Sequence, residues 1–226
     1  MGTDTRDRIL EAATRLFHER GFAATSVATI LREAGVKSGS LYHFFGSKEA
    51  LLVAAVERHL DELERTVLAP AERASDDPFG RVFALLEHYR RRLVMTGCTL
   101  GCPVGDLALE VGSGRPEARA LIARYFALWT AGVRRWLEAA GDRLPEDADR
   151  GTLARLVLSV MEGGLMQAQA AGTPEPFEAA VAQLRAHFQL LASRARRARG
   201  EENGPPQAAA QEAVGSDAEA GEWRSW

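Results

Sequence analysis

The chain has 226 residues, of which 46% are hydrophobic, and its formal net charge is −3. This length supports one large or two small domains, and the charge excludes a uniformly basic nucleic-acid-binding protein, so any DNA binding requires a local patch. No run approaches the roughly 18–20 apolar residues of a transmembrane helix, and the first eight residues carry no apolar signal core, so we expect a cytoplasmic protein with no membrane partner.

Apolar residues recur at helical spacing along the chain, and no strand-like alternation persists, so we predict an all-α fold. Three short helices are expected first, over residues 5–20, 26–34 and 38–45. Ser47 is then expected to cap a long helix that runs from residue 48 to about residue 69.

The second half of the sequence predicts longer helices. They begin at Pro78 and end before Gly97, then cover about residues 104–111, 116–140, 148–171 and 175–197. From residue 200 onward the composition shifts to Gly, Pro, Ala, Gln and acidic residues without a helical stripe. We therefore expect residues 200–226 to be a disordered tail.

The segment between residues 25 and 48 carries the strongest functional signal. Two short amphipathic helices are joined at Gly35, where glycine permits the positive φ of a tight turn. This is helix-turn-helix geometry, in which the second helix enters the DNA major groove. No acidic residue occurs from Ala34 to Lys48. The alternative is a helical domain without a DNA role, since short helices around a glycine turn occur in many such domains.

Residues 25–30 read TSVATI and residues 34–51 read AGVKSGSLYHFFGSKEAL. These segments resemble the signature of TetR-family repressors, and the resemblance extends over about residues 5–56. It departs from the common family pattern at residues 29–31, where many members have Asp-Ile-Ala, and at Phe44, where many have His or Tyr. The resemblance implies a homodimer that binds palindromic operator DNA and releases it when a small-molecule inducer binds the second domain.

The resemblance also assigns DNA contacts by motif position. It implies phosphate contacts from Thr25 and Ser26 at the start of the supporting helix. The residues expected to line the groove or its phosphates are Lys37, Ser38, Gly39, Ser40, Tyr42, His43 and Lys48. Phosphate contacts of this kind fix the register of the protein, and base contacts determine its sequence preference.

The predicted organisation has four parts. Residues 1–47 form a three-helix helix-turn-helix domain, and residues 48–72 form a connecting helix. Residues 73–199 form a helical bundle for ligand binding and dimerisation, and residues 200–226 form the tail.

The last two predicted helices carry apolar residues at near-heptad spacing. They are Leu156, Val160 and Gly164 on the first helix and Val181, Leu184 and Phe188 on the second. Two such helices from each subunit form a four-helix dimer interface. The alternative is a packing interface within one subunit. The need of a helix-turn-helix protein for two half-sites one DNA turn apart favours the dimer.

Aromatic residues of the helix over residues 116–140 are candidates for a ligand pocket. Tyr125, Phe126 and Trp129 lie at helical spacing, where aromatic side chains more often pack in the core.

The stretch from Gly97 to Glu110 resembles a Gly-Cys-x-x-Gly-x-Leu-x-x-Glu motif in one branch of TetR-like regulators. The resemblance implies either sensing of electrophiles through the matching cysteine or binding of flavonoid-like or drug-like compounds. Cys102 precedes a predicted helix, a position that favours the thiolate of a sensor. The alternative, which we favour, is a buried and inert cysteine. Cys98 and Cys102 supply only two metal ligands, so we expect neither a metal nor another cofactor.

An enzyme is the competing class of function. The five histidines show no metal-binding spacing such as H-E-x-x-H, and the sequence has no nucleophile elbow, phosphate loop or dinucleotide loop. We therefore expect a protein without enzymatic activity.

Overall fold

The computed structural model describes residues 2–112 and 114–201, and every regular element in those ranges is helical, as predicted. Residues 202–226 of the predicted tail lie outside the described part of the chain. In order, the elements are α1 (Gly2–Arg20), α2 (Val27–Glu33), α3 (Ser40–Phe44), α4 (Lys48–Leu63), η1 (Glu64–Leu68), α5 (Ala69–Ala74), α6 (Pro78–Met95), α7 (Pro103–Val111), α8 (Pro116–Ala139), η2 (Gly141–Arg143), α9 (Arg150–Ala171) and α10 (Glu175–Ala198).

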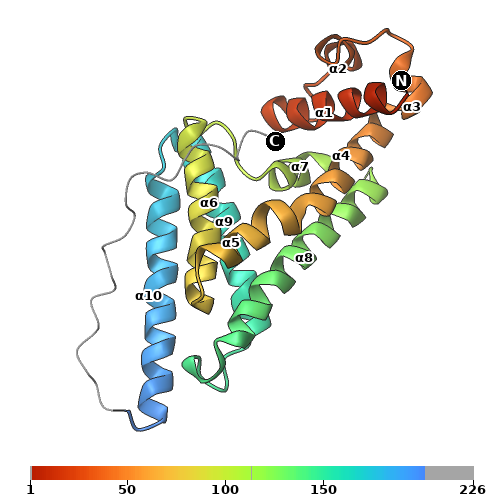
Figure 1. Ribbon diagram of the computed structural model, residues 1–226. Coiled ribbons are helices and arrows are strands. Elements are labelled where there is room, and N and C mark those ends of the chain that lie inside the picture. Colours follow the sequence, from red (N-terminus) through yellow and green to blue (C-terminus); the bar gives the residue numbers. More distant parts are fainter. Residues whose placement is uncertain (1, 113, 202–226) are drawn as a thin grey trace.

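The first three helices gather at one end of the molecule, against the start of α4 (Figure 1). Ile9 and Leu16 of α1 are fully buried with Ile30 of α2, Leu41 of α3 and Leu52 of α4. Burying an aliphatic side chain of this size contributes about 1.5–3 kcal/mol relative to leaving it exposed. This small core therefore fixes how α3 is presented.

Side-chain caps begin two of these helices. The hydroxyl of Ser26 accepts the backbone N–H of Thr29 at 3.1 Å, and the hydroxyl of Ser47 accepts that of Ala50 at 3.0 Å. Each cap satisfies an N–H group that lacks an intrahelical partner. Ser47 was the predicted cap of the long helix.

The connecting helix extends further than the sequence indicated. It passes from α4 through the wide π-helical turn η1 into α5 and ends at Ala74 rather than near residue 69. The prediction ended at Pro70 because proline disrupts the interior of an α-helix. Here Pro70 falls in the first turn of α5, directly after the π-helical turn. The indole N–H of Trp136 on α8 donates to the Glu72 carboxylate at 2.7 Å and fastens α5 to α8.

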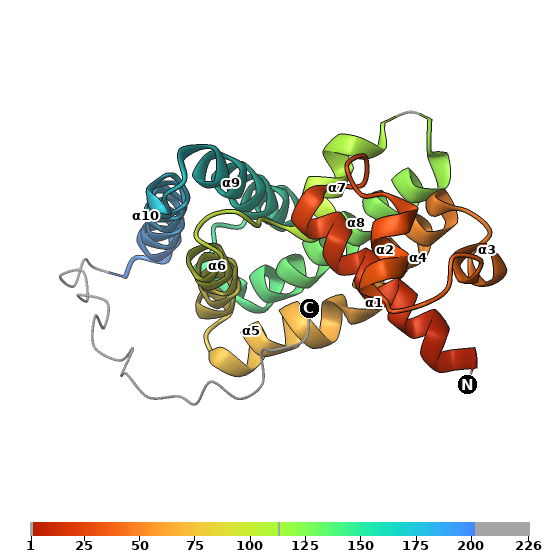
Figure 2. The ribbon, with the colours of Figure 1, turned by 90° about the horizontal axis from the view of Figure 1, so that it is seen from above.

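Helices α6, α8, α9 and α10 form the larger part of the protein, with α10 at the edge farthest from α1–α3 (Figure 1). Seen from above, α7 lies directly beside α1, between the small N-terminal domain and this bundle (Figure 2). Phe188 of α10 packs edge-on against Phe79 of α6, with ring centroids 5.4 Å apart.

Three residues expected at a dimer interface are buried inside one subunit. Leu184 and Phe188 face the core of their own chain. At Gly164 an added Cβ would lie 3.0 Å from the Phe177 ring and 3.3 Å from the Phe177 Cα, so this glycine permits close packing of α9 on α10. These residues form the intrasubunit interface that the sequence left as the alternative. Leu156, Val160 and Val181 keep exposed surface.

Candidate nucleic-acid interface

The turn between α2 and α3 has the tight geometry of a helix-turn-helix unit. Gly35 adopts φ +62°, a left-handed conformation that glycine reaches without steric cost. The backbone N–H of Val36 returns to the carbonyl of Leu31 at 3.0 Å and closes the end of α2. Leu41 then anchors α3 from below, because its side chain is fully buried.

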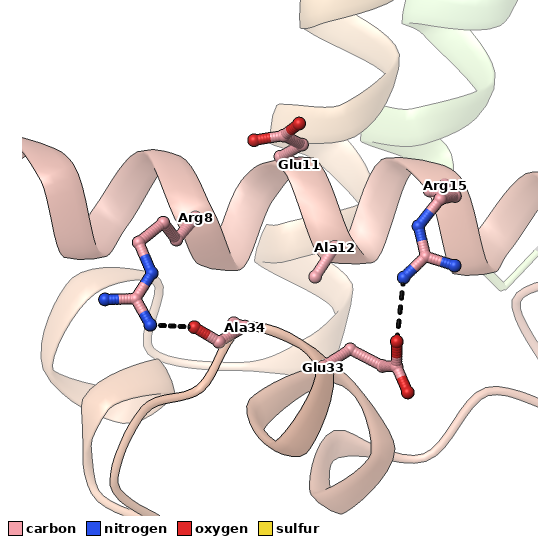
Figure 3. A pocket seen from close by; sticks show the side chains of 6 residues that line it. All are labelled: Arg8, Glu11, Ala12, Arg15, Glu33 and Ala34. Carbon is pink, nitrogen blue, oxygen red and sulfur yellow. Dashed lines mark hydrogen bonds and ion pairs between the residues drawn. The ribbon is translucent and has the colours of Figure 1, made fainter.

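Two arginines of α1 hold the end of α2 in place. Arg8 donates to the carbonyls of Ala34 and Gly35, and Arg15 forms an ion pair with Glu33 at 2.9 Å. Figure 3 shows both side chains reaching from α1 across a shallow hollow to the end of α2. These contacts fix the orientation of the turn and hence of α3.

The predicted DNA contacts gather on one exposed surface around α3, which we call the recognition surface. Lys37, Ser38, Gly39 and His43 are exposed there, and Tyr42 is 63% exposed. Ser40 is half-buried at the start of α3, and Ser26 is exposed at the start of α2. A surface with donors and no carboxylate suits a polyanion such as DNA.

Thr25 does not belong to this surface, which corrects its expected role in phosphate contact. Its side chain is only 1% exposed. Its hydroxyl donates to the carbonyl of Gly21 at 2.7 Å and lies 3.2 Å from that of Leu16. Thr25 therefore holds the α1–α2 turn together.

Lys48 also has partners within the subunit. Its ammonium donates to the carbonyl of Phe22 at 2.5 Å and lies 4.2 Å from the centroid of the Phe22 ring. Burial lowers the pKa of this ammonium. Lys48 thus ties α4 to the α1–α2 turn, and its contact with phosphate stays a prediction.

Sequence reasoning gave no role to Glu110, which joins α7 to the N-terminal domain. Its carboxylate accepts the backbone N–H groups of Phe22 and Ala23, at 3.2 and 2.9 Å. Gly21 makes room for it, since an added Cβ there would lie 2.4 Å from Glu110 Oε1. The one feature of the sequence that pointed to Glu110 was the motif over residues 97–110, which ends in this glutamate. The partners lie almost 90 positions away, so local patterns could not identify them.

The aromatic candidates for a ligand pocket separate into two groups. Tyr125 and Trp129 are buried in the core, which is the alternative that the sequence left open for aromatic side chains at helical spacing. Phe126 is half-buried and lines a groove between α7, α8 and α9. We call it the acidic groove, because it is lined by Asp106 and Leu109 of α7, Phe126 of α8, and Glu162 and Met166 of α9.

Cys102 caps the start of α7, as its position in the sequence indicated, but its side chain is buried. Its sulfur accepts the backbone N–H of Gly105 at 3.4 Å, yet its side chain is only 1% exposed. Burial, followed by the charge of Glu162, raises the pKa of the Cys102 thiol well above its usual value. Cys102 is therefore buried, as the favoured alternative expected, and its burial argues against a reactive sensor thiol.

Neither a metal site nor a membrane-spanning helix is found in residues 2–112 and 114–201. No cluster of three or more His, Cys, Asp or Glu side chains there is arranged to hold a metal ion. No helix in those ranges is both long and apolar enough to cross a membrane.

Two family models match the chain over most of its length. The model for bacterial regulatory proteins of the tetR family matches residues 9–55. The model for the C-terminal domain of LmrA/YxaF-like transcriptional regulators matches residues 78–183. The fold and the recognition surface thus define a DNA-binding transcriptional regulator of the helix-turn-helix class. The chain belongs to the TetR family.

Individual relatives cover most of both chains. The transcriptional regulator LmrA of Bacillus subtilis is 31% identical over 174 residues, which span 76% of this chain and 90% of LmrA. The transcriptional repressor NemR of Escherichia coli K12 is 27% identical over 191 residues, spanning 80% and 92%. The crystal structure of reduced E. coli NemR has a TM-score of 0.74 at 25% identity and covers 81% of this chain and 96% of its own.

Proposed function

We propose that this regulator is a homodimeric repressor that binds a palindromic operator and releases it when a small molecule binds its second domain. The observation that carries the proposal is the recognition surface. It presents Lys37 from the α2–α3 turn and Tyr42 and His43 from α3, and contacts from α1 hold the end of α2 in a fixed orientation. Repression is supported by the E. coli relative, which is named a transcriptional repressor.

Dimerisation is supported by exposed apolar residues on the last two helices. Leu156 of α9 is 38% exposed and Leu190 of α10 is 67% exposed, and Val160 and Val181 are half-buried nearby in sequence. Leu156 and Leu190 lie on two helices that pack against each other, so their exposed side chains offer apolar surface to a second subunit. A twofold dimer places two recognition surfaces on inverted half-sites, which is why we expect a palindrome.

Release by a ligand is supported by the position of α7. Asp106 and Leu109 of this helix line the acidic groove, and Glu110 of the same helix binds the α1–α2 turn. A shift of α7 on ligand binding would therefore move the N-terminal domain that carries α3. In a dimer, such a movement changes the spacing of the two recognition surfaces.

The DNA proposal is tested with duplexes from the DNA that flanks the chain's own gene. Fluorescence anisotropy at several salt concentrations should give tight, salt-dependent binding to one duplex, and footprinting should place an inverted repeat in it. A scrambled duplex is the control. Equal affinity for both duplexes at every salt concentration would contradict specific operator binding. A reporter placed behind the mapped site then tests repression.

The dimer is tested by analytical ultracentrifugation of Leu156→Glu. We expect the native protein to sediment as a dimer and the variant to shift toward monomer, because a buried charge opposes association. Leu128→Glu is the matched control, since Leu128 is an exposed leucine on α8. A native protein that sediments as a monomer at all concentrations would contradict the proposal.

A further inference from the structure

The acidic groove has the size and lining of a small-molecule site. Its volume is about 360 Å³, within the roughly 300–1,000 Å³ typical of ligand pockets. Apolar side chains form most of its lining. Leu109 is 77% exposed and Met166 is 55% exposed, although both are large and hydrophobic. The groove therefore offers apolar surface that the subunit itself does not cover.

Glu162 lies in this apolar groove with part of its hydrogen-bonding capacity unused. Its carboxylate sits against Gly105, where an added Cβ would be 2.2 Å from Oε2. The Cys102 thiol donates to this carboxylate. Its Oε1 atom is buried and has no hydrogen-bond partner among the described residues. Burial, and then the charge of Asp106, raise the pKa of Glu162 to about 7, because an unpaired carboxylate is costly in an apolar site.

The charges around Glu162 favour a cationic ligand. Among the described residues that line the groove, Asp106 and Glu162 are the ionisable ones, and both are acidic. Burial also raises the pKa of Asp106, and hydrogen bonds from the backbone of Gly101 and the side chain of Gln169 partly offset this rise. A cation bound in the groove would pair with a carboxylate that is otherwise buried beside another negative charge.

We propose that the acidic groove binds a lipophilic cation, with its charge against Glu162 and its apolar body on Phe126 and Met166. The inference rests on the proposed function, because it names the chemical class of the inducer. The face of the Phe126 ring adds to the attraction, since aromatic faces attract cations. The charge complementarity of the groove distinguishes this ligand from an anion of the same shape.

The probes are tetraphenylphosphonium and tetraphenylborate, which share a shape and differ in charge. Isothermal titration of the full-length protein should show binding of the cation, and binding of the anion should be at least tenfold weaker. Glu162→Gln should weaken cation binding about tenfold or more, whereas Glu117→Gln, an exposed glutamate on α8, should leave it unchanged. Equal affinity for the two ions, or unchanged cation binding by Glu162→Gln, would overturn the inference.

A second variant keeps the test decisive if Glu162→Gln does not fold. Met166→Lys introduces a positive charge at the exposed rim of the groove and should also weaken cation binding. Operator binding is measured separately by anisotropy. A protein that binds its operator but not the cation overturns this inference alone. The same holds if a second subunit covers the groove and so prevents the cation from binding. A protein that binds no operator overturns the proposed function instead.

Discussion

Oε1 of Glu110 accepts the backbone N–H of Phe22 at 3.2 Å, although the two residues are 88 positions apart. The second oxygen of the same carboxylate accepts the N–H of Ala23 at 2.9 Å. The Phe22 ring is also flanked by cations, with Lys48 at 4.2 Å and Arg115 at 4.6 Å from its centroid. The α1–α2 turn is therefore bound to both α4 and α7.

Replacing Glu110 should loosen this turn. Glu110→Ala removes two hydrogen bonds to a charged acceptor, so we expect faster hydrogen exchange at residues 21–25 and unfolding stability lower by about 1–3 kcal/mol. Glu110→Gln keeps one carbonyl acceptor and should have a smaller effect. Glu117→Ala is the control. Unchanged exchange in Glu110→Ala would show that the turn does not depend on α7.

Lys37→Ala tests the recognition surface directly. Removing one phosphate contact should weaken operator binding, and the slope of log affinity against log salt should become shallower by about 1. Arg73→Ala, an exposed cation on α5, should change neither quantity. Anisotropy titrations at three or more salt concentrations measure both. A slope identical to that of the native protein would argue against a phosphate contact by Lys37.

Thr25→Val separates a structural role from a DNA-binding role. The variant has the same shape but cannot donate to the carbonyl of Gly21, so we expect a loss of about 1 kcal/mol in unfolding stability. Thr25→Ser retains the hydroxyl and should recover part of that loss. Operator affinity, measured well below the melting temperature, should be the same for all three proteins. A large loss of affinity without a loss of stability would restore the phosphate contact implied by the family motif.

Acid should destabilise the protein through its buried histidines. Burial lowers the pKa of His18 and His88 to about 4 and that of His59 to about 3. The folded state favours the neutral forms of these histidines. Their contribution to the free energy of unfolding is therefore fully present above pH 6.5 and is lost as the pH falls toward 4. Each contributes a loss on the order of 2 kcal/mol at pH 5. Glu162 acts in the opposite direction. Its pKa is raised to about 7, so the folded state favours its protonated form, and the free energy of unfolding rises as the pH falls below about 7.

Urea unfolding at pH 7.5 and pH 5.0 measures this balance. The native protein should have a lower free energy of unfolding at pH 5.0, because protonation of three buried histidines costs more stability than protonation of Glu162 adds. His59→Gln should reduce the difference between the two pH values, and His187→Gln, an exposed histidine, should not. Equal stability of the native protein at both pH values would contradict the expected dominance of the histidines.

Cys102 should resist thiol reagents in the native state. Its thiol is buried and its pKa is raised, and only the thiolate reacts. In Cys98→Ser protein, reaction of Cys102 with a chromogenic disulfide should be slow in buffer and at least 100-fold faster in denaturant. Complete labelling within seconds under native conditions would reinstate the sensor hypothesis.

Local sequence patterns were sufficient for most of the fold. Apolar spacing and capping residues predict helices that end within a few residues of those observed, and the turn at Gly35 predicts the exposed face of α3. Heptad spacing on α9 and α10 was ambiguous, because the same pattern serves packing within one subunit and between two. At Leu184 and Phe188 the intrasubunit packing prevails.

The remaining features depend on residues that meet only after folding. The raised pKa values of Cys102 and Glu162 arise in part because Glu162 of α9 lies against the start of α7, 60 positions from Cys102 in the chain. Glu110 likewise finds its partners on a distant turn. Helical periodicity reports which face of a helix is buried but not which helix covers it, so these contacts could not be predicted from the sequence.

The wide turn at Glu64–Leu68 divides the connecting helix into two parts with different rotational phase. A π-helical turn accommodates one extra residue, and each residue of an α-helix turns by about 100°. If the five residues Glu64–Leu68 were wound as ordinary α-helix instead, the segment that follows would be rotated by about that angle. Glu72 would then point away from the Trp136 indole that it now binds. The π-helical turn therefore sets the direction in which α5 presents Glu72 to α8.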